Sequence, residues 1–490
     1  MTIAPTESTS DIERAPQTAR SRAATSLRTW TAIALDIIIA LYAVALTIIL
    51  VAGGMNLGWL TVREAAKPVL VLWIVVPIRL ALNLPSWTGS RSVQRVWATS
   101  KPALRAIADR LPASIRDAAF AYCVTRLATT SVGFLANLLF ASDRVRPFEM
   151  PFTRSTLAEV FAAWDSGWYF DIAMQGYYYS LDGQSSVAFF PLYPIAMRAL
   201  ALPFGSSEAA VWGAGIAVSH AAFLAGLIAL HRLTEFLFKD REVARRTVLY
   251  VAVFPFSFFL TQVYPGGLFF LLTVIGVSTA YGSRWWLAGF CGGLATLTRP
   301  HGILIGIPLG LLALKACSPR EALRRLVALV PIPGALVGYS LYVHSVAGDP
   351  LAWLTAQSQW GFSLGHPPWE QLLGVIARIE RYGLYDYFFT SESAAFPLFH
   401  GAAAIFLLAV TPAVFARLGA PLGMWVLTSL IVPLTGNALE GIGRYGAVLF
   451  PVFMVLGTVQ SPRLHEALLI VWSLFLALFV GLFVTWHPIY

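Results

Sequence analysis

The sequence predicts an all-α, multi-pass transmembrane helical bundle, and composition and segment length are the observations that predict it. Of the 490 residues, 57% are apolar and only 12% are charged, whereas soluble domains carry roughly a quarter charged residues. Apolar segments recur along nearly the whole chain, and most are near the ~20 residues that a helix needs to cross a bilayer. Because backbone amides in lipid must be satisfied within each segment, these segments are expected to be helices.

The chain is expected to divide into four parts. Residues 1–28 are polar and lack the apolar core of a signal peptide, so they are interpreted as a disordered cytoplasmic tail. Residues 29–117 hold two extra N-terminal spans, at 29–53 and 68–84, followed by a basic cytoplasmic segment. The transmembrane core is expected over 118–460, and residues 461–490 supply a C-terminal span.

About eleven to thirteen crossings are expected in all. The later candidate spans are 118–141, 209–230, 248–262, 268–281, 285–297, 303–314, 326–346, 396–416, 422–435, 448–459 and 467–486. The apolar segment 188–205 must not cross the membrane if the number of crossings is to leave the C terminus outside. If it does cross, one later pair of short apolar segments is wrongly assigned. Its prolines favour a re-entrant or interfacial segment.

The distribution of positive charge sets the expected orientation. The net charge is +9, and most Lys and Arg fall in the tail and in the segments 86–117, 231–246 and 315–325. If these parts are cytoplasmic, the chain obeys the positive-inside rule, and the basic balance reports topology rather than nucleic-acid binding. The long segments 142–187 and 347–395 then face the exoplasmic side and carry short amphipathic helices. We expect a multi-pass protein of a bacterial plasma membrane with an exoplasmic site and no identified protein partner.

The first candidate motif, "AAWDSGWYFDIAMQGY", lies in the first of these external segments. Drawn as one helix over 161–172, it places Phe161, Trp168 and Ile172 on one face with Asp165 among them. A carboxylate held on an apolar face is desolvated, which favours a general-base role. The alternative is that the tryptophans are interfacial anchors and the aspartate caps a helix.

A second acid and an aromatic corner follow the first motif. Asp171 lies six positions after Asp165 and off the same face, so the two acids are not a pair from one helix. In "SSVAFFPLYP", two prolines with Phe189, Phe190 and Tyr193 form a rigid corner suited to lining a lipid-facing groove. A proline-broken helix start is the competing interpretation.

Two arginines interrupt apolar runs later in the chain. Arg299 lies in "LTRPHG" and Arg444 in "NALEGIGRYGAVLFP". A charge inside or beside the membrane is costly and indicates a functional site by default. A guanidinium can bind phosphate oxygens bidentately, whereas anchoring to lipid headgroups is the alternative role. The other polar side chains of these two motifs are His301, Glu440 and Tyr445.

Several common kinds of site have no signature in the sequence. There is no G-x-x-x-x-G-K-[ST] phosphate loop and no dinucleotide-binding G-x-G-x-x-G motif after a strand. His220, His344 and His400 are isolated in or beside apolar stretches, and Cys123, Cys291 and Cys317 lack metal or disulfide spacing. A phosphate-activated substrate is therefore expected to arrive in the membrane as a lipid. A divalent metal is compatible with such chemistry, but no site for one is visible.

Six motifs together resemble one known family. In chain order they are "WDSGWYFDIAMQGY", "AFFPLYP", "FPFSFFLTQVYPGGLFFLL", "LAGFCGGLATLTRPHG", "GDPLAWLTAQSQWG" and "GIGRYGAVLFPVF". They resemble the PIG-V family, also called GPI mannosyltransferase 2-like, of the GT-C class of membrane glycosyltransferases. The likeness covers about residues 118–460.

The resemblance implies an inverting mannosyltransferase that uses a polyprenyl-phosphate mannose donor and a lipid-linked or surface glycan acceptor on the exoplasmic face. Asp165 would be the general base, and Arg299 and Arg444 would bind the donor phosphate. No resident cofactor is implied. The further substrate-binding candidates are Trp164, Asp171, Phe189, Phe190, Tyr193, Pro194, Tyr264, His301, Glu440 and Tyr445.

One departure from the family pattern affects the expected activity. Family members usually have Tyr-Thr-Glu-Ser where this chain has Tyr264, Pro265, Gly266 and Gly267. Without the acid, the chain could have changed acceptor, recruited Glu440 or Asp171, or lost activity. The competing function is therefore a non-catalytic accessory subunit or a transporter of lipid-linked glycans, although no internal repeat of the transporter kind is seen.

Overall fold

The computed structural model describes residues 31, 34–44, 55–56, 61–62, 71–72, 75–76, 110–140, 159–181, 183–363, 365–389, 395–436, 439–487 and 489. The chain forms two units, Met1–Leu111 and Pro112–Tyr490. In the first, an apolar helix covers Ala34–Val44, and strands β1 (Met55–Asn56) and β2 (Thr61–Val62) pair antiparallel. The expected tail and most of the two N-terminal spans lie outside the described residues.

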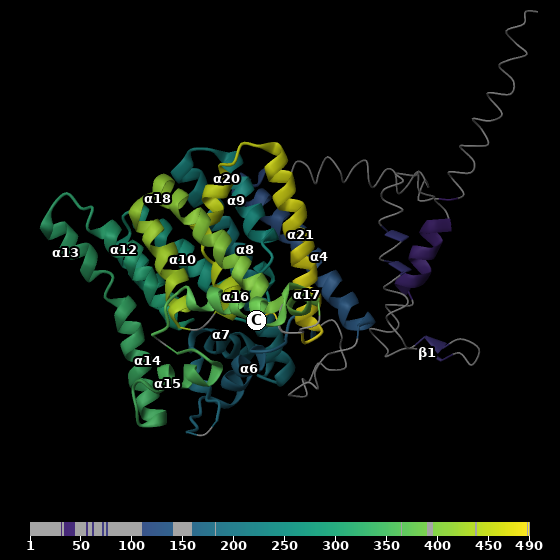
Figure 1. Ribbon diagram of the computed structural model, residues 1–490, viewed down its shortest axis with the longest axis horizontal. Helices are drawn as coiled ribbons and strands as arrows, with labels where there is room; N and C mark the ends of the chain where they lie inside the picture. The colour runs from purple at the N-terminus through teal and green to yellow at the C-terminus, as the bar shows by residue number, and fades with distance from the viewer. Residues whose placement is uncertain are drawn as a thin grey trace, which may run out of the picture. The chain divides into compact units, whose positions relative to one another are not determined.

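The described part of the second unit is helical, which confirms the predicted all-α class (Figure 1). Its α-helices are α4 (Ala113–Leu139), α6 (Ser166–Gln175), α7 (Leu192–Ala201), α8 (Glu208–Phe238), α9 (Arg241–Val253), α10 (Gly266–Tyr281), α11 (Trp285–Thr296), α12 (Gly306–Ala313), α13 (Pro319–Val327), α14 (Pro331–Ala347), α15 (Ala352–Gln357), α16 (Glu370–Tyr382), α17 (Leu384–Phe389), α18 (Ala395–Thr435), α19 (Ile442–Gly446), α20 (Phe450–Gly457) and α21 (Pro462–Val484). The 3-10 helices are η2 (Ser186–Ala188), η3 (Leu202–Phe204), η4 (Ser257–Leu260), η5 (Pro300–Ile305), η6 (Ser358–Trp360) and η7 (Leu439–Gly441).

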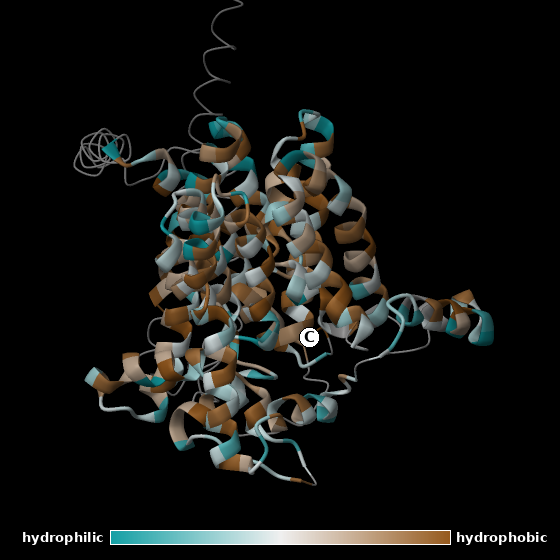
Figure 2. Cartoon of the chain, turned by 90° about the vertical axis from the view of Figure 1, so that its left-hand side faces the viewer, coloured by the Kyte–Doolittle hydropathy of each residue, from teal (hydrophilic) through white to brown (hydrophobic). Residues whose placement is uncertain are grey.

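Five stretches of the described chain are long and apolar enough to cross a membrane, which confirms an integral membrane protein. They are Ala113–Leu139, Glu208–Phe238, Pro319–Ala347, Pro397–Thr435 and Pro462–Val484. Apolar residues run along the helices of the bundle in Figure 2. The shorter apolar helices do not reach the usual spanning length, so the expected number of crossings stays a prediction.

Two segments differ in length from an ordinary membrane-spanning helix: one is too short, and the other is long and interrupted. The segment 188–205 contains α7, whose ten residues extend only about 15 Å; it cannot cross a bilayer as one helix. The two expected spans 396–416 and 422–435 are joined as α18, which is interrupted at Gly419 with φ 81° and ψ 175°. Only glycine adopts that conformation without strain.

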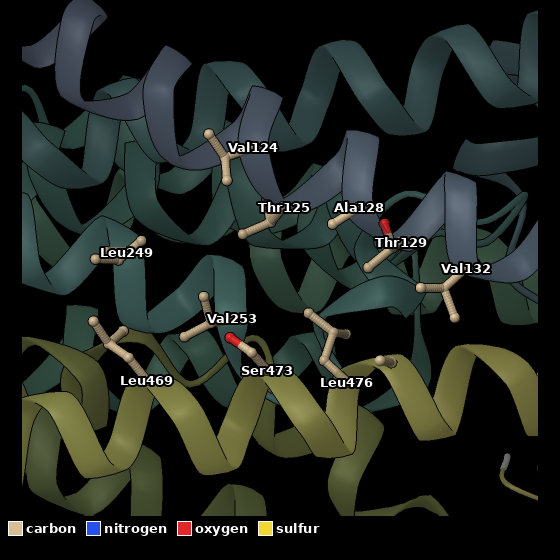
Figure 3. A pocket seen from close by; sticks show the side chains of 11 residues that line it. Val124, Thr125, Ala128, Thr129, Val132, Leu249, Val253, Leu469, Ser473 and Leu476 are labelled. Carbon is tan, nitrogen blue, oxygen red and sulfur yellow. The ribbon is translucent and has the colours of Figure 1, made fainter. Parts of the chain in front are cut away.

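A groove of about 250 Å³ lies between α4, α9 and α21 (Figure 3). Apolar side chains such as Val124, Leu249 and Leu469 face it, together with the hydroxyl-bearing Thr129 and Ser473. None of the predicted site residues lines this groove. The candidate site therefore has to be sought elsewhere in the unit.

Candidate active site

A second cavity, of about 340 Å³, collects the charged residues singled out in the sequence. Its walls come from α6, η5, α15, η6, α18 and α19 and from the turns next to them. The predicted site residues that line it are Asp165, Phe189, Arg299, His301, Arg444 and Tyr445. These residues lie up to 280 positions apart in sequence and meet in one place.

The backbone turn before α6 decides where Asp165 points. Trp164 has φ 57°, a left-handed conformation that a tryptophan rarely adopts, and α6 begins only at Ser166. The prediction of one helix over 161–172 is therefore wrong, because the left-handed residue interrupts it. Asp165 occupies the N-cap position, yet its side chain accepts no capping hydrogen bond. Its carboxylate is turned to the cavity instead.

The side chain of Tyr264 fixes this turn through hydrogen bonds to its backbone. Its buried hydroxyl accepts a hydrogen bond from the Asp165 backbone N–H at 3.0 Å and donates one to the Ala163 carbonyl at 3.3 Å. The aromatic ring is itself packed against Phe259 and Phe483. Tyr264 thus orients Asp165 from outside the cavity wall.

Arg444 is the partner of the Asp165 carboxylate. Its Nη1 donates to Asp165 Oδ2 at 2.8 Å, and its guanidinium lies over the rings of Phe259, Tyr264 and Tyr445 at 5.8 Å. Burial lowers the pKa of Arg444, but the neighbouring Asp165 more than offsets this and leaves that pKa raised. Arg444 Nε is buried without a hydrogen-bond partner. The guanidinium therefore has donors left for a ligand.

Arg299 is a second cation in the cavity, and among the described side chains no acid forms an ion pair with it. Its side chain is only 6% exposed, and its Nη1 is buried with no hydrogen-bond partner. Burial and, to a lesser extent, Arg444 lower the pKa of Arg299 to about 10, so it remains charged at neutral pH. A Cβ atom added at Gly266 would lie 3.1 Å from Arg299 Nη2. The position where family members usually have a glutamate, Gly266 in this chain, therefore lies beside Arg299.

An aromatic wall faces these charges. Trp353 and Trp360, from α15 and η6, line the cavity, and Phe189 contacts Trp360 edge-on at 5.3 Å. Gln357 donates to the Ala188 carbonyl at 2.7 Å, which ties α15 to the turn that carries Phe189. The candidate-residue prediction omitted these three residues from 352–360, although the fifth motif contains them. Tyr169 of α6, which also lines the cavity, was missed as well.

The remaining predicted residues lie off the cavity. Trp164 donates to the Phe483 carbonyl, and Tyr193 is buried with its hydroxyl on Gly215 and Ser219. Phe190 packs on Tyr339, and Pro194 is buried in α7. Their positions indicate packing roles.

The two other acids considered in the sequence do not complete the site. Asp171 is exposed and does not line the cavity, although burial of part of the carboxyl raises its pKa. The side chain of Glu440 lies outside what the structure describes. Among the described residues, no group of three or more His, Cys, Asp or Glu is arranged to hold a metal ion.

The fold and the site together define a multi-pass helical membrane protein whose largely apolar cavity carries one acid and two arginines. Residues 128–317 match the sequence model of the Mannosyltransferase (PIG-V) family. This match agrees with the resemblance seen in the six motifs, and the matched region contains Asp165, Phe189 and Arg299.

Individual relatives cover only part of this chain. GPI mannosyltransferase 2 of Yarrowia lipolytica (strain CLIB 122 / E 150) is 36% identical over 141 residues, which are 29% of this chain and 38% of that protein. The chain thus matches less than half the length of this relative.

The chain is also similar in part to solved structures from Archaeoglobus fulgidus. The apo oligosaccharyltransferase is 12% identical, with a TM-score of 0.43 over 76% of this chain and 56% of that chain. The oligosaccharyltransferase AglB in complex with an inhibitory peptide and a dolichol-phosphate is 12% identical, with a TM-score of 0.37 over 74% and 56%.

Proposed function

We propose that this protein is an inverting membrane mannosyltransferase that moves mannose from a polyprenyl-phosphate donor to a lipid-linked or surface glycan acceptor. The observation that carries the proposal is one cavity that holds a carboxylate, Asp165, and a buried guanidinium, Arg299, which has no acid partner within the described part of the chain. The family match and the mannosyltransferase relative support the sugar. The site is proposed to open on the exoplasmic face of a bacterial plasma membrane.

In this mechanism Asp165 is the general base. Its carboxylate accepts the proton of an acceptor hydroxyl while that oxygen attacks C1 of the mannose from the face opposite the phosphate. The bond from C1 to the phosphate oxygen breaks, and its electron pair stays on the leaving phosphate. Since the donor's phosphate ester is already activated, the protein has to supply only positioning, a base and charge stabilisation.

The two arginines supply that charge stabilisation. Arg299 and Arg444 both line the cavity, and we propose that they donate to phosphate oxygens, where the negative charge grows as the bond breaks. Apolar residues of η5 and α18, including Ile303, Leu304 and Val432, line the same cavity and are proposed to contact the first units of the donor lipid. The cavity volume is at the lower end of the roughly 300–1,000 Å³ typical of ligand sites.

Replacement of the proposed base tests the assignment. Purified Asp165→Asn protein, incubated with labelled polyprenyl-phosphate mannose and an acceptor lipid extract, is expected to lose transfer by at least ~100-fold. Asp171→Asn is the matched control, because this acid is exposed and outside the cavity. Undiminished incorporation by the Asp165→Asn protein would contradict the role of base.

A non-catalytic accessory subunit is the second candidate function. It is favoured by the glycine at position 266, where family members usually have a glutamate. Glycan profiling of a deletion strain separates the two functions. A lipid or surface glycan short by one hexose supports the transferase. Unchanged mannosylated species in that strain, together with no transfer by the purified protein, support the accessory subunit.

A further inference from the structure

The described wall of the cavity carries two positive charges and one negative charge. Arg444 uses one nitrogen, Nη1, on the carboxylate of Asp165, while Arg299 has no acid partner among the side chains that the structure describes. With His301 neutral, the two arginines and one aspartate of the described cavity wall leave a net charge of +1. Arg299 is buried, whereas the side chains of Arg444 and Asp165 are 17% and 21% exposed. An uncompensated charge on a buried side chain is costly.

This net charge matches both ends of the proposed reaction. The donor is a phosphodiester with a single negative charge, which would neutralise the cavity when Asp165 is ionised. The product is a lipid phosphate monoester whose charge approaches −2 at neutral pH. It would neutralise the cavity only if Asp165 has taken up a proton. The proton that Asp165 takes from the acceptor hydroxyl therefore keeps the cavity electrically neutral with the product bound.

We infer that the Asp165–Arg444 ion pair couples the base to the leaving group: when Asp165 takes up the acceptor proton, it releases Arg444 to the phosphate. This inference deepens the proposed function and rests on it. The acceptor O–H proton passes to Asp165, the acceptor oxygen bonds to C1, and the bond from C1 to the phosphate oxygen breaks. As the carboxylate becomes neutral, the phosphate gains its second charge and replaces it as the partner of Arg444.

Binding of a product analogue tests the coupling without any transfer reaction. The probe is farnesyl phosphate, with farnesol as the uncharged control, bound to the purified full-length protein in detergent. The Asp165→Asn variant imitates the protonated base. It is expected to bind farnesyl phosphate about tenfold tighter than the wild-type protein, a change of ~1.4 kcal/mol, and to bind farnesol unchanged.

A double-mutant cycle shows which arginine is released. The Asp165→Asn change is repeated in an Arg444→Gln background and in an Arg299→Gln background. The tightening is expected to vanish without Arg444 and to persist without Arg299, because Arg444 is the one of these two arginines that donates to the Asp165 carboxylate. Arg444→Lys serves as a second variant that retains the charge and the tightening if Arg444→Gln fails to fold. Thermal unfolding in detergent identifies such a failure.

The possible results separate the inference from the proposed function. Equal tightening in both arginine backgrounds would mean that the aspartate acts only as a nearby negative charge and would overturn the coupling. No tightening in the wild-type background would also overturn it. If the wild-type protein transfers no mannose while the tightening depends on Arg444, the proposed function falls and the exchange of partners by Arg444 stands.

Discussion

Buried polar side chains outside the cavity fix the position of Asp165. Arg126 of α4 is buried and donates to the carbonyls of Ala252 and Ser257 and to the hydroxyls of Ser257 and Thr261. These hydrogen bonds hold the η4 turn, which leads directly to Tyr264 and so to the Asp165 backbone. A buried cation that is satisfied by carbonyls and hydroxyls stabilises one backbone path, because any other path would leave it unpaired.

Gly266 is the residue at which an acid would change the site most directly. A Gly266→Glu side chain would start 3.1 Å from Arg299 Nη2, and its carboxylate is expected to pair with that guanidinium. The affinity for farnesyl phosphate should then fall about tenfold, or ~1.4 kcal/mol. Gly266→Gln, nearly the same size without the charge, is the control measured in the same binding assay. Equal losses in the two variants would show that crowding, rather than pairing with Arg299, is responsible.

At the residue scale, the sequence singles out charged side chains that lie in apolar runs, because burying such a charge costs free energy. Asp165, Arg299 and Arg444 could be singled out because charges in apolar runs need a reason. Their pairing could not be predicted, since the 279 positions between Asp165 and Arg444 leave no local pattern. The left-handed backbone of Trp164 was equally hidden, because nothing in "AAWDSG" marks a tryptophan for that conformation.

At the scale of elements, close backbone contact at η5 positions Arg299. A Cβ atom at Gly302 would lie 2.7 Å from the Ala295 carbonyl carbon and 2.7 Å from Thr296 Cα, both backbone atoms of α11. Arg299, the residue that precedes η5, has an extended backbone. The turn can therefore approach α11 only with glycine at this position.

Gly302→Ala is expected to destabilise the protein by about 1–3 kcal/mol through overpacking and to lower transfer by displacing Arg299. The matched control is Gly310→Ala in α12, where no atom lies within 4 Å of the added Cβ and alanine favours the helix. Thermal unfolding in detergent and labelled-mannose transfer measure the two effects. A Gly302→Ala protein as stable and active as the Gly310→Ala protein would refute the proposed close contact.

The sequence predicted long apolar helices well and irregular elements poorly. Hydrophobic length identifies α8 and α21 because lipid permits few alternatives. It does not identify α15 and η6, six and three residues long, whose tryptophans resemble interfacial anchors until the fold places them opposite Asp165. Their role depends on contacts with distant turns, which periodicity does not report.

At the scale of the whole molecule, native cysteines can test the expected orientation. Cys317 is exposed in the basic stretch 315–325, which is expected to be cytoplasmic, whereas Ser363 lies exposed in the segment expected outside. In a Cys123→Ser background, a membrane-impermeant thiol reagent should label Ser363→Cys in intact cells and Cys317 only after permeabilisation. Cys291 is buried and should stay unlabelled in both conditions. Labelling of Cys317 in intact cells would reverse the proposed orientation.

The ion pair between Asp165 and Arg444 also has a consequence for how the protein is made. Ribosomes add roughly 5–20 residues per second, so the segment with the acid is synthesised roughly 15–60 s before the one with its arginine. During that interval the growing chain carries a carboxylate without its later neighbour. The cavity can acquire its final charge balance only once α19 has been synthesised, and a chain that stops before α19 is expected to lack mannose transfer.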